Sequence, residues 1–244
     1  MSGRLRLPDS RWARIALSVV NVVVFLTIWG IVAKEEVINP LFFPAPSDTW
    51  DALREGFADG TLTDALLWSL RCFAIGMVAA AVVGIPVGLL MGSSPAAYTL
   101  LSPYVWAMAS LPRVAITPLL VLIFGFSQMA ELVLIFLSAL FPIVINCMAG
   151  PKTVDPSLLR AGRVFGASRL ALYAKVVFPF TLPFIVSGLN QGLTRGLVGM
   201  VIAEIFGGND GLGYVIQRAG ETFEAPTLYA ALFLLVAISL SLGQ

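Results

Sequence analysis

The sequence predicts an all-α integral membrane protein with about six transmembrane helices. Hydrophobic residues make up 58% of the 244-residue chain and charged residues only 12%, about half the charged fraction of a typical soluble domain. Several apolar runs approach the roughly 20 residues needed to cross a bilayer as a helix. No internal repeat and no low-complexity linker is evident, so we expect one domain over residues 1–244.

The N-terminal segment places four arginines before a long apolar run at 15–33. The core of a signal peptide is shorter and ends in small residues at a cleavage site, whereas this run ends in Lys34-Glu35-Glu36. We therefore interpret it as an uncleaved first span. The other expected spans are 65–91, 101–125, 130–149, 182–206 and 226–243.

The third expected span contains Pro103, Pro112 and Pro118. Prolines are tolerated in membrane helices where neighbouring groups satisfy the freed carbonyls. We therefore expect this span to be broken into short pieces and to be buried in protein.

A short amphipathic helix is expected between the first two spans, with Trp50, Leu53 and Phe57 on one side and Ser47 or Asp48 as its N-cap. We interpret it as a helix that lies at the membrane surface and fixes the start of the second span. A substrate gate is the alternative.

The distribution of Lys and Arg predicts the orientation, because basic residues concentrate on the cytoplasmic side. Basic residues gather at the N-terminus and in the segment 150–175, here named the polar island. The segment 35–64 is instead rich in Asp and Glu. We expect both termini and the polar island to be cytoplasmic.

Local signals within the polar island predict two short helices. Asp155 can cap the first, with Pro156 at the first helical position. Gly166 can end that helix in the left-handed conformation. Ser168 can cap a second helix, which Pro179 is expected to interrupt.

The polar island resembles the cytoplasmic coupling loop of ABC importer permeases, known as the EAA loop. That pattern is Glu-Ala-Ala, three residues, Gly, nine residues, then Ile-x-Leu-Pro. The matching positions in this sequence are Arg160, Ala161, Gly162, Gly166, Val176, Phe178 and Pro179. The segments D-P-S-L-L-R-A-G-R-V-F-G-A-S and V-I-A-E-I-F-G-G-N-D-G-L-G-Y look most like the nitrate/sulfonate/taurine branch, and the resemblance runs from about Leu41 to the C-terminus.

The resemblance implies a permease subunit of the bacterial inner membrane that imports a small, anionic solute by alternating access. Its implied partners are an ABC ATPase subunit, an extracytoplasmic solute-binding protein that docks on the loop 207–213, a second permease copy and membrane lipid. The coupling contact with the ATPase would be made by Leu158, Leu159, Arg160, Ala161, Gly162, Arg163, Phe165 and Gly166. Arg160 reverses the charge of the family Glu, so either the ATPase carries a compensating acid or this position faces solvent.

The chain contains no G-x-x-x-x-G-K-[ST] phosphate-binding loop. We therefore expect it not to be an enzyme and to carry no cofactor, with ATP bound and hydrolysed by the partner subunit. The absence of histidine and the presence of only two cysteines, Cys72 and Cys147, argue against a metal site, and we expect both cysteines to be buried packing residues. The net charge of +1 argues against nucleic-acid binding.

Charged residues within spans are candidates for function, because they are costly in a membrane. Arg195 is expected to line a polar substrate pathway together with Asn190, Gln191 and Thr194. The alternative is that Arg195 pairs with an acid such as Glu204 or with backbone carbonyls. For Arg71 and Arg113, nearer the span ends, we expect snorkelling to the membrane surface.

Two rows of glycine at four-residue spacing predict close approach of helices. They are Gly84, Gly88 and Gly92 in the second span, and Gly188, Gly192 and Gly196 in the fifth. Static tight packing and a sliding gate or dimer seam are both open interpretations, the second chiefly for the fifth span. The rival function is a self-contained secondary transporter or channel, for which Glu131 and Glu204 are the available ion-coupling carboxylates.

Overall fold

The computed structural model describes residues 11–35, 38–39 and 41–242, and the side chains of 11–14 lie outside that description. The described residues form helices and no β-strand. In chain order the elements are α1 (Arg11–Lys34), α2 (Pro46–Ala58), α3 (Thr61–Ser93), α4 (Pro95–Ser110), α5 (Arg113–Phe124), α6 (Gln128–Ala149), η1 (Gly150–Thr153), α7 (Pro156–Val164), α8 (Arg169–Leu172), the π-helical turn η2 (Tyr173–Val177), α9 (Phe178–Gly207), α10 (Leu212–Glu221) and α11 (Ala225–Leu242).

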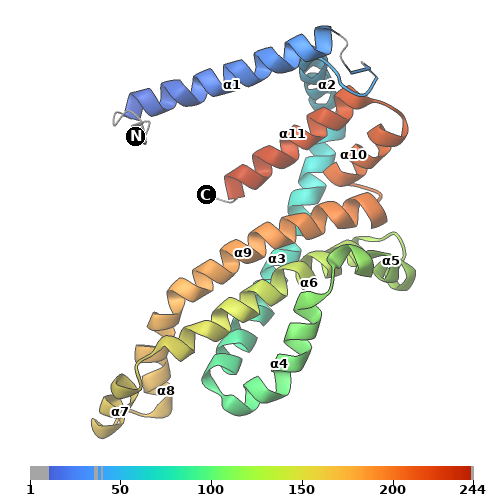
Figure 1. The fold of residues 1–244 in the computed structure, drawn as a ribbon. Coiled ribbons are helices and arrows are strands. Elements are labelled where there is room, and N and C mark those ends of the chain that lie inside the picture. The colour runs from blue at the N-terminus through green and yellow to red at the C-terminus, as the bar shows by residue number, and fades with distance from the viewer. Residues whose placement is uncertain (1–10, 36–37, 40, 243–244) are drawn as a thin grey trace, which may run out of the picture.

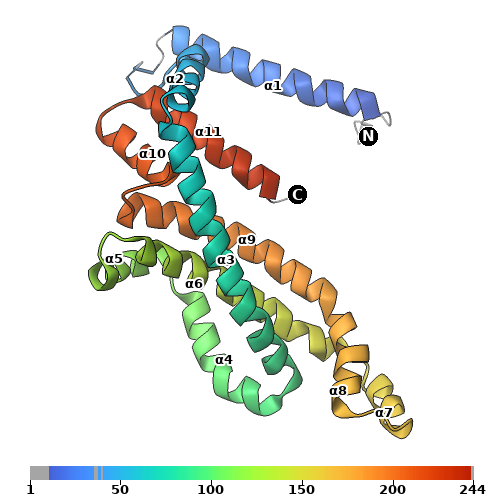
Figure 2. The same cartoon turned by 180° about the vertical axis from the view of Figure 1, so that it is seen from behind.

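Helix α6 is the centre of the molecule, because the most extensive helix contacts are those of α6 with α9 and with α3. Figures 1 and 2 show α6 and α9 running antiparallel side by side, with α3 crossing them. The start of α1 and the end of α11 lie on the same side of the molecule, whereas α2 and α10 lie on the other.

The two glycine rows explain how α3 and α9 approach α6 so closely. A Cβ atom on Gly84 would lie 2.9 Å from Cγ2 of Ile143, and one on Gly192 would lie 2.9 Å from Cγ1 of the same side chain. A Cβ on Gly88 would lie 2.6 Å from the carbonyl oxygen of Val144. Both rows therefore pack on α6 of the same chain, which favours the interpretation as tight packing over that as a dimer seam.

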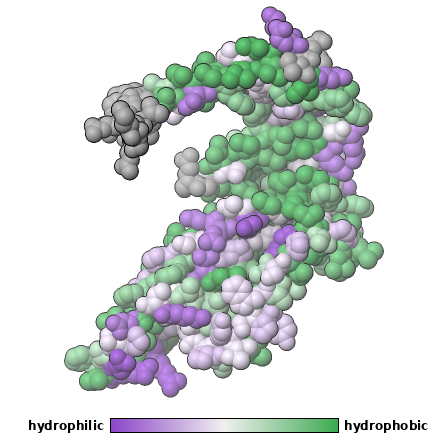
Figure 3. Space-filling model, in the orientation of Figure 1, coloured by the Kyte–Doolittle hydropathy of each residue, from purple (hydrophilic) through white to green (hydrophobic). Residues whose placement is uncertain are grey.

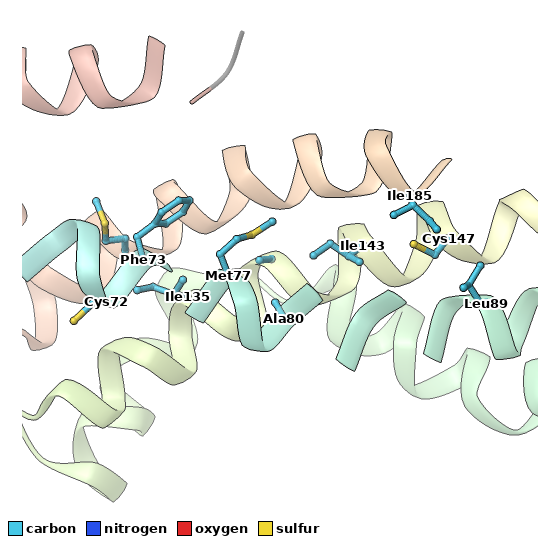
Figure 4. Packing of buried hydrophobic residues seen from close by; sticks show 11 residues of the cluster. Cys72, Phe73, Met77, Ala80, Leu89, Ile135, Ile143, Cys147 and Ile185 are labelled. Carbon is cyan, nitrogen blue, oxygen red and sulfur yellow. The ribbon is translucent and has the colours of Figure 1, made fainter. Parts of the chain in front are cut away.

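The main hydrophobic core lies between α3, α6 and α9 (Figure 4). Ile135, Ile143 and Met200 are completely buried within it. Cys72 and Cys147 are also fully buried there and are free thiols. The expectation that the two cysteines are buried packing residues is confirmed.

A second core lies at the end of the molecule formed by α2, α3, α10 and α11. Leu62 of α3 and Leu212 of α10 are its largest fully buried side chains. The hydroxyl of Ser69 accepts a hydrogen bond of 2.9 Å from the backbone N–H of Leu212. This bond ties the start of α10 to α3.

Helix α1 makes few contacts with the rest of the chain, and only 6% of its apolar segment is buried inside the protein. Trp29 is the main exception, because it donates a hydrogen bond of 2.9 Å to the carbonyl of Pro44 and packs among aromatic rings. Those rings belong to Phe25, Phe43, Tyr229 and Phe233. The surface of α1 is otherwise largely apolar (Figure 3).

Five helical segments of the described chain are long and apolar enough to cross a membrane, and a sixth is possible if one bent pair counts as a span. The five are Ile15–Lys34, Thr61–Ser93, Gln128–Thr153, Arg169–Gly207 and Ala225–Leu242. This agrees with the predicted all-α membrane protein of about six spans. Arg4 and Arg6, which contributed to the predicted orientation, lie outside the described residues.

The bent pair is α4 and α5, which meet at 97°, and it corresponds to the third expected span. The expected break is confirmed only at Pro112, because Pro103 and Pro118 lie within helices. The expectation that this span is buried in protein is wrong for the single chain, since most side chains of both helices are exposed and only Val105, Thr117 and Leu120 are buried.

The short helix before the second span also differs from expectation at its cap. It begins at Pro46 with Ala45 at the N-cap and no side-chain cap, rather than at Ser47 or Asp48. Trp50 and Phe57 are exposed, while Leu53 packs into the second core. The proline at the first helical position replaces the need for one capping acceptor.

Candidate functional site

The first candidate site is the polar island, whose first helix, α7, follows the capping signals of the sequence. The carboxylate of Asp155 accepts a hydrogen bond of 2.7 Å from the backbone N–H of Ser157. That bond lowers the pKa of the Asp155 carboxyl. Pro156 occupies the first helical turn, as predicted.

The end of α7 is a Schellman motif built on Gly166. Its φ is +77°, its N–H donates to the carbonyl of Arg163 at 3.0 Å, and the N–H of Ala167 donates to the carbonyl of Gly162 at 2.9 Å. Ser168 then caps α8 by accepting a hydrogen bond of 3.2 Å from the N–H of Ala171. The predicted stop and the second cap are both confirmed.

The expected interruption at Pro179 is wrong. The chain continues from α8 through the π-helical turn η2 into α9, and Pro179 lies in the first turn of α9. The π-helical turn before it accommodates the proline, because hydrogen bonding there shifts by one residue, the N–H of Phe178 donating to the carbonyl of Tyr173. The polar island and the fifth span are therefore joined by continuous helical backbone from Arg169 to Gly207.

The exposed side chains of the polar island are strongly apolar at one end. Phe165 is 88% exposed, Val164 84% and Leu170 78%. Leu158 is 43% exposed. Side chains of this size are rarely left in water unless a partner covers them, and Figure 3 shows apolar surface beside hydrophilic surface at this tip.

The remaining island residues divide between solvent and the interior. Arg160, Ala161 and Arg163 are exposed, whereas Leu159 and Gly162 are half-buried. Leu159 lines a hollow of about 500 Å³ beneath α7. The expected coupling-contact residues therefore do not all lie on one exposed face, since Leu159 points inward.

The second candidate site is a hollow of about 380 Å³ between α6, α9 and the break between α4 and α5, here named the polar hollow. Its polar and aromatic lining comprises Arg113, Ser138, Phe141, Asn146, Gln191 and Arg195. Of the four expected pathway residues, Arg195 and Gln191 line it. Asn190 and Thr194 do not: they are exposed elsewhere on α9, and the Thr194 hydroxyl donates to the carbonyl of Asn190 at 3.2 Å.

Arg113 also lines the polar hollow, and the sequence did not predict that position. Its Nη1 donates to the carbonyls of Met108 and Leu111 at 2.7 and 2.8 Å, and its Cζ lies 5.4 Å from the ring centroid of Phe141. The expectation of snorkelling did not include these contacts. The break at Pro112 was the signal in the sequence, because it frees carbonyls that need a donor.

The suggested pairing of Arg195 with Glu204 is not formed. Glu204 is completely buried, and its Oε2 accepts a hydrogen bond of 2.7 Å from the N–H of Gly213. Glu131 lies beside it and accepts a hydrogen bond of 3.0 Å from the indole of Trp68. The two carboxyls lie where the start of α10 packs on α3, α6 and α9, away from the polar hollow.

Within the described part of the chain, no group of three or more His, Cys, Asp or Glu is placed to hold a metal.

Comparison with known proteins identifies the family of the chain. Residues 84–243 match the family described as the binding-protein-dependent transport system inner membrane component. The chain is 36% identical to the taurine transport system permease protein TauC of Escherichia coli K12, over 98% of this chain and 88% of that protein. It is 31% identical to the nitrate import permease protein NrtB of Leptolyngbya laminosa, over 80% and 72%. It is also 29% identical to the putative aliphatic sulfonates transport permease protein SsuC of Bacillus subtilis 168, over 88% and 78%.

A solved structure gives the same fold. A chain of the MetNI methionine ABC transporter, in an inward-facing conformation, superposes with a TM-score of 0.65 at 21% identity, covering 75% of this chain and 91% of that one. The resemblance of the polar island to a coupling loop, the matched segment and the shared fold agree. The chain belongs to the family of binding-protein-dependent transport system inner membrane components, the membrane-spanning permeases of ABC importers.

Proposed function

We propose that this chain imports a small sulfonate-like or nitrate-like anion by alternating access, as one of two identical permease subunits driven by a separate ATPase. The proposal is carried above all by the exposed apolar end of α7, at the position of the family's coupling loop. Phe165 and Val164 are among the most exposed large apolar side chains of the described chain. Burying them in a partner is favourable by about 25 cal/mol per Å² of apolar surface removed from water.

The ATPase contact is a helix-in-groove interaction, in which α7 lies in a cleft of the partner. Its proposed contact set is the one expected from the sequence, with Leu158 and Phe165 as apolar anchors and Arg160 and Arg163 at the rim. ATP is bound and hydrolysed on the partner, and this chain supplies no catalytic group and needs no cofactor. Movement of α7 reaches the membrane through the continuous helix Arg169–Gly207.

Substrate passes along the polar face of α9, where Asn190, Gln191, Thr194 and Arg195 are exposed. Figure 3 shows hydrophilic surface over the middle of α9 in otherwise apolar surroundings. The names of the relatives support an anion such as taurine, another sulfonate or nitrate. An arginine suits such groups, because its guanidinium can bind two oxygens at once.

The other proposed partners follow the same topology. A solute-binding protein docks at the end that carries α10 and the loop 207–213, opposite the polar island. A second copy covers part of the α9 face, and lipid covers the apolar surface of α1. Both termini and the polar island are cytoplasmic, in a bacterial inner membrane.

The second candidate function is a secondary transporter that couples transport to an ion through the Glu131–Glu204 pair. Each carboxyl has one buried oxygen without a hydrogen-bond partner. However, Gly208, Gly211 and Gly213 pack directly against Glu204, so the pair is sealed rather than open to a pathway. This geometry favours a structural role for the pair and an ATP-driven mechanism.

The experiment that tests the proposed function is purification of the chain with its candidate ATPase, followed by reconstitution with the binding protein in liposomes. We expect a stoichiometric complex and uptake of labelled taurine or nitrate that requires ATP. Phe165→Ala should weaken the complex, whereas Arg71→Gln, an exposed change on α3 outside the polar island, should not. Uptake by the chain alone, without ATP and driven by an ion gradient, would establish the secondary transporter instead.

A further inference from the structure

Two arginines from distant parts of the sequence face the same small hollow. Arg113 begins α5, and Arg195 lies in the second half of α9. Both line the polar hollow of about 380 Å³, so two positive charges face the same small space. Like charges are brought together at a cost, so the arrangement requires a compensating partner.

The described lining of the hollow includes no Asp or Glu. The carboxyls of the neighbouring spans, Glu131 and Glu204, accept hydrogen bonds from Trp68 and Gly213 and do not line the hollow. Two positive charges in a membrane-embedded hollow without a carboxylate are expensive. A bound anion removes that cost.

The donors around the hollow are arranged for an oxyanion. The carbonyls of Met108 and Leu111 hold Nη1 of Arg113, which fixes the guanidinium and leaves its other N–H groups for a ligand. Arg195 is exposed to the hollow from the opposite helix. The amide of Gln191 bridges to Oδ1 of Asn146 at 3.4 Å, so a polar wall faces the two cations.

The location of the hollow favours binding of a solute over binding of a lipid headgroup. Ser138, Phe141 and Asn146 belong to the middle and second half of α6, which places the hollow within the apolar part of the span. Its volume lies at the small end of the range for ligand pockets. A compact anion fits this space. The rigid ring of Phe141 packs against Arg113, whose Cζ lies 5.4 Å from the ring centroid.

We propose that Arg113 and Arg195 form a two-arginine subsite in the substrate pathway that binds the oxyanion group of the solute. The subsite deepens the proposed importer function and rests on it for its place in transport. Arg113, held at the helix break, positions one side of the anion. Arg195 binds the other side and connects it to α9, the helix that continues to the polar island.

The test measures thermal unfolding of the purified permease with and without taurine, nitrate or chloride, in detergent free of anionic lipid. We expect taurine or nitrate to raise the Tm of the wild type by about 2–4 °C. Arg113→Gln and Arg195→Gln should each lose this shift, and Arg113→Lys should retain part of it. Arg71→Gln, an exposed change on α3 outside the hollow, should keep the full shift.

Uptake in proteoliposomes with ATPase and binding protein separates the two proposals. With wild-type complex active, a rise of at least about tenfold in KM for either Gln variant supports the subsite, since a lost charged hydrogen bond weakens binding by that order. An equal anion shift in wild type and both Gln variants, or none in the wild type, overturns the subsite. A shift that appears only when anionic lipid is added assigns the site to a headgroup and also overturns it. An intact shift without any ATP-driven uptake overturns the proposed function and leaves the subsite standing.

Discussion

Replacing Gly166 separates backbone conformation from bulk at the end of α7. Its φ of +77° lies in the left-handed region, and a Cβ atom added there would meet no atom within 4 Å. The left-handed conformation costs an ordinary L-residue about 1–2 kcal/mol, with β-branched residues at the upper end. That strain lowers the equilibrium constant for forming the native turn about 5- to 30-fold. We therefore expect Gly166→Val to weaken ATPase binding by up to that factor without affecting membrane insertion.

The assay is the affinity of the purified ATPase subunit for the permease in nanodiscs, together with ATP-driven uptake. Gly166→Asn is the first control, because Asn tolerates the left-handed conformation at a helix C-terminus. Gly125→Val is the second. Gly125 has φ +69° and likewise has no atom within 4 Å of a Cβ, but it lies between α5 and α6.

We expect Gly166→Asn and Gly125→Val to bind the ATPase about as tightly as wild type, and Gly166→Val to bind it most weakly. If Gly166→Asn loses as much affinity as Gly166→Val, the conformation of the turn is not what matters and a direct glycine contact with the ATPase must be sought. If Gly166→Val binds as tightly as wild type, the helix break is not needed for coupling and the argument is refuted.

Three further predictions concern the fold and the loop. Glu204→Ala should destabilise the permease by about 1–3 kcal/mol, because the buried N–H of Gly213 loses its acceptor, whereas Glu204→Gln should retain most of the stability; equal melting temperatures would contradict this. Gly88→Val should cost about 1–3 kcal/mol by forcing α3 from α6, while Gly30→Val, with nothing within 4 Å of its Cβ, should be neutral in the same melting experiment. Asp155→Ala should weaken ATPase binding at neutral pH. Since the folded-state pKa of Asp155 is lowered, its contribution is fully present above pH about 4 and is lost as the pH falls further, so the two proteins should converge in acid.

The sequence contained the information for the polar island because capping is a local property. Asp155, Gly166 and Ser168 each act on backbone groups within a few residues. The apolar runs likewise predicted the spans, since crossing a bilayer depends on length and composition within one segment. The continuation of the helix through Pro179 was missed because a proline normally ends a helix, and the π-helical turn that accommodates it here has no signal in the sequence.

The polar hollow could be predicted only in part. Arg195 and Gln191 were identified because they are polar within an apolar span. Arg113 was misjudged, because its role depends on the 97° bend between α4 and α5 and on Phe141 from another helix. Likewise, the sealing of Glu204 depends on the path of the loop to α10. Such contacts join distant segments, and spacing along one sequence does not show them.

The arrangement of α9 relates the two candidate sites mechanically. The C-terminal end of the helix is held at Glu204, and its N-terminal end continues through η2 to α8. At a rise of 1.5 Å per residue, Arg195 lies roughly 14 Å from Glu204, whereas Arg169 lies roughly 52 Å from it along the helical path. If α9 turns as a rod about its held end, a movement at the polar island is reduced about fourfold at Arg195. A displacement of several ångströms at the ATPase contact then moves the arginine by about 1 Å, which is enough to make or break a hydrogen bond to an anion.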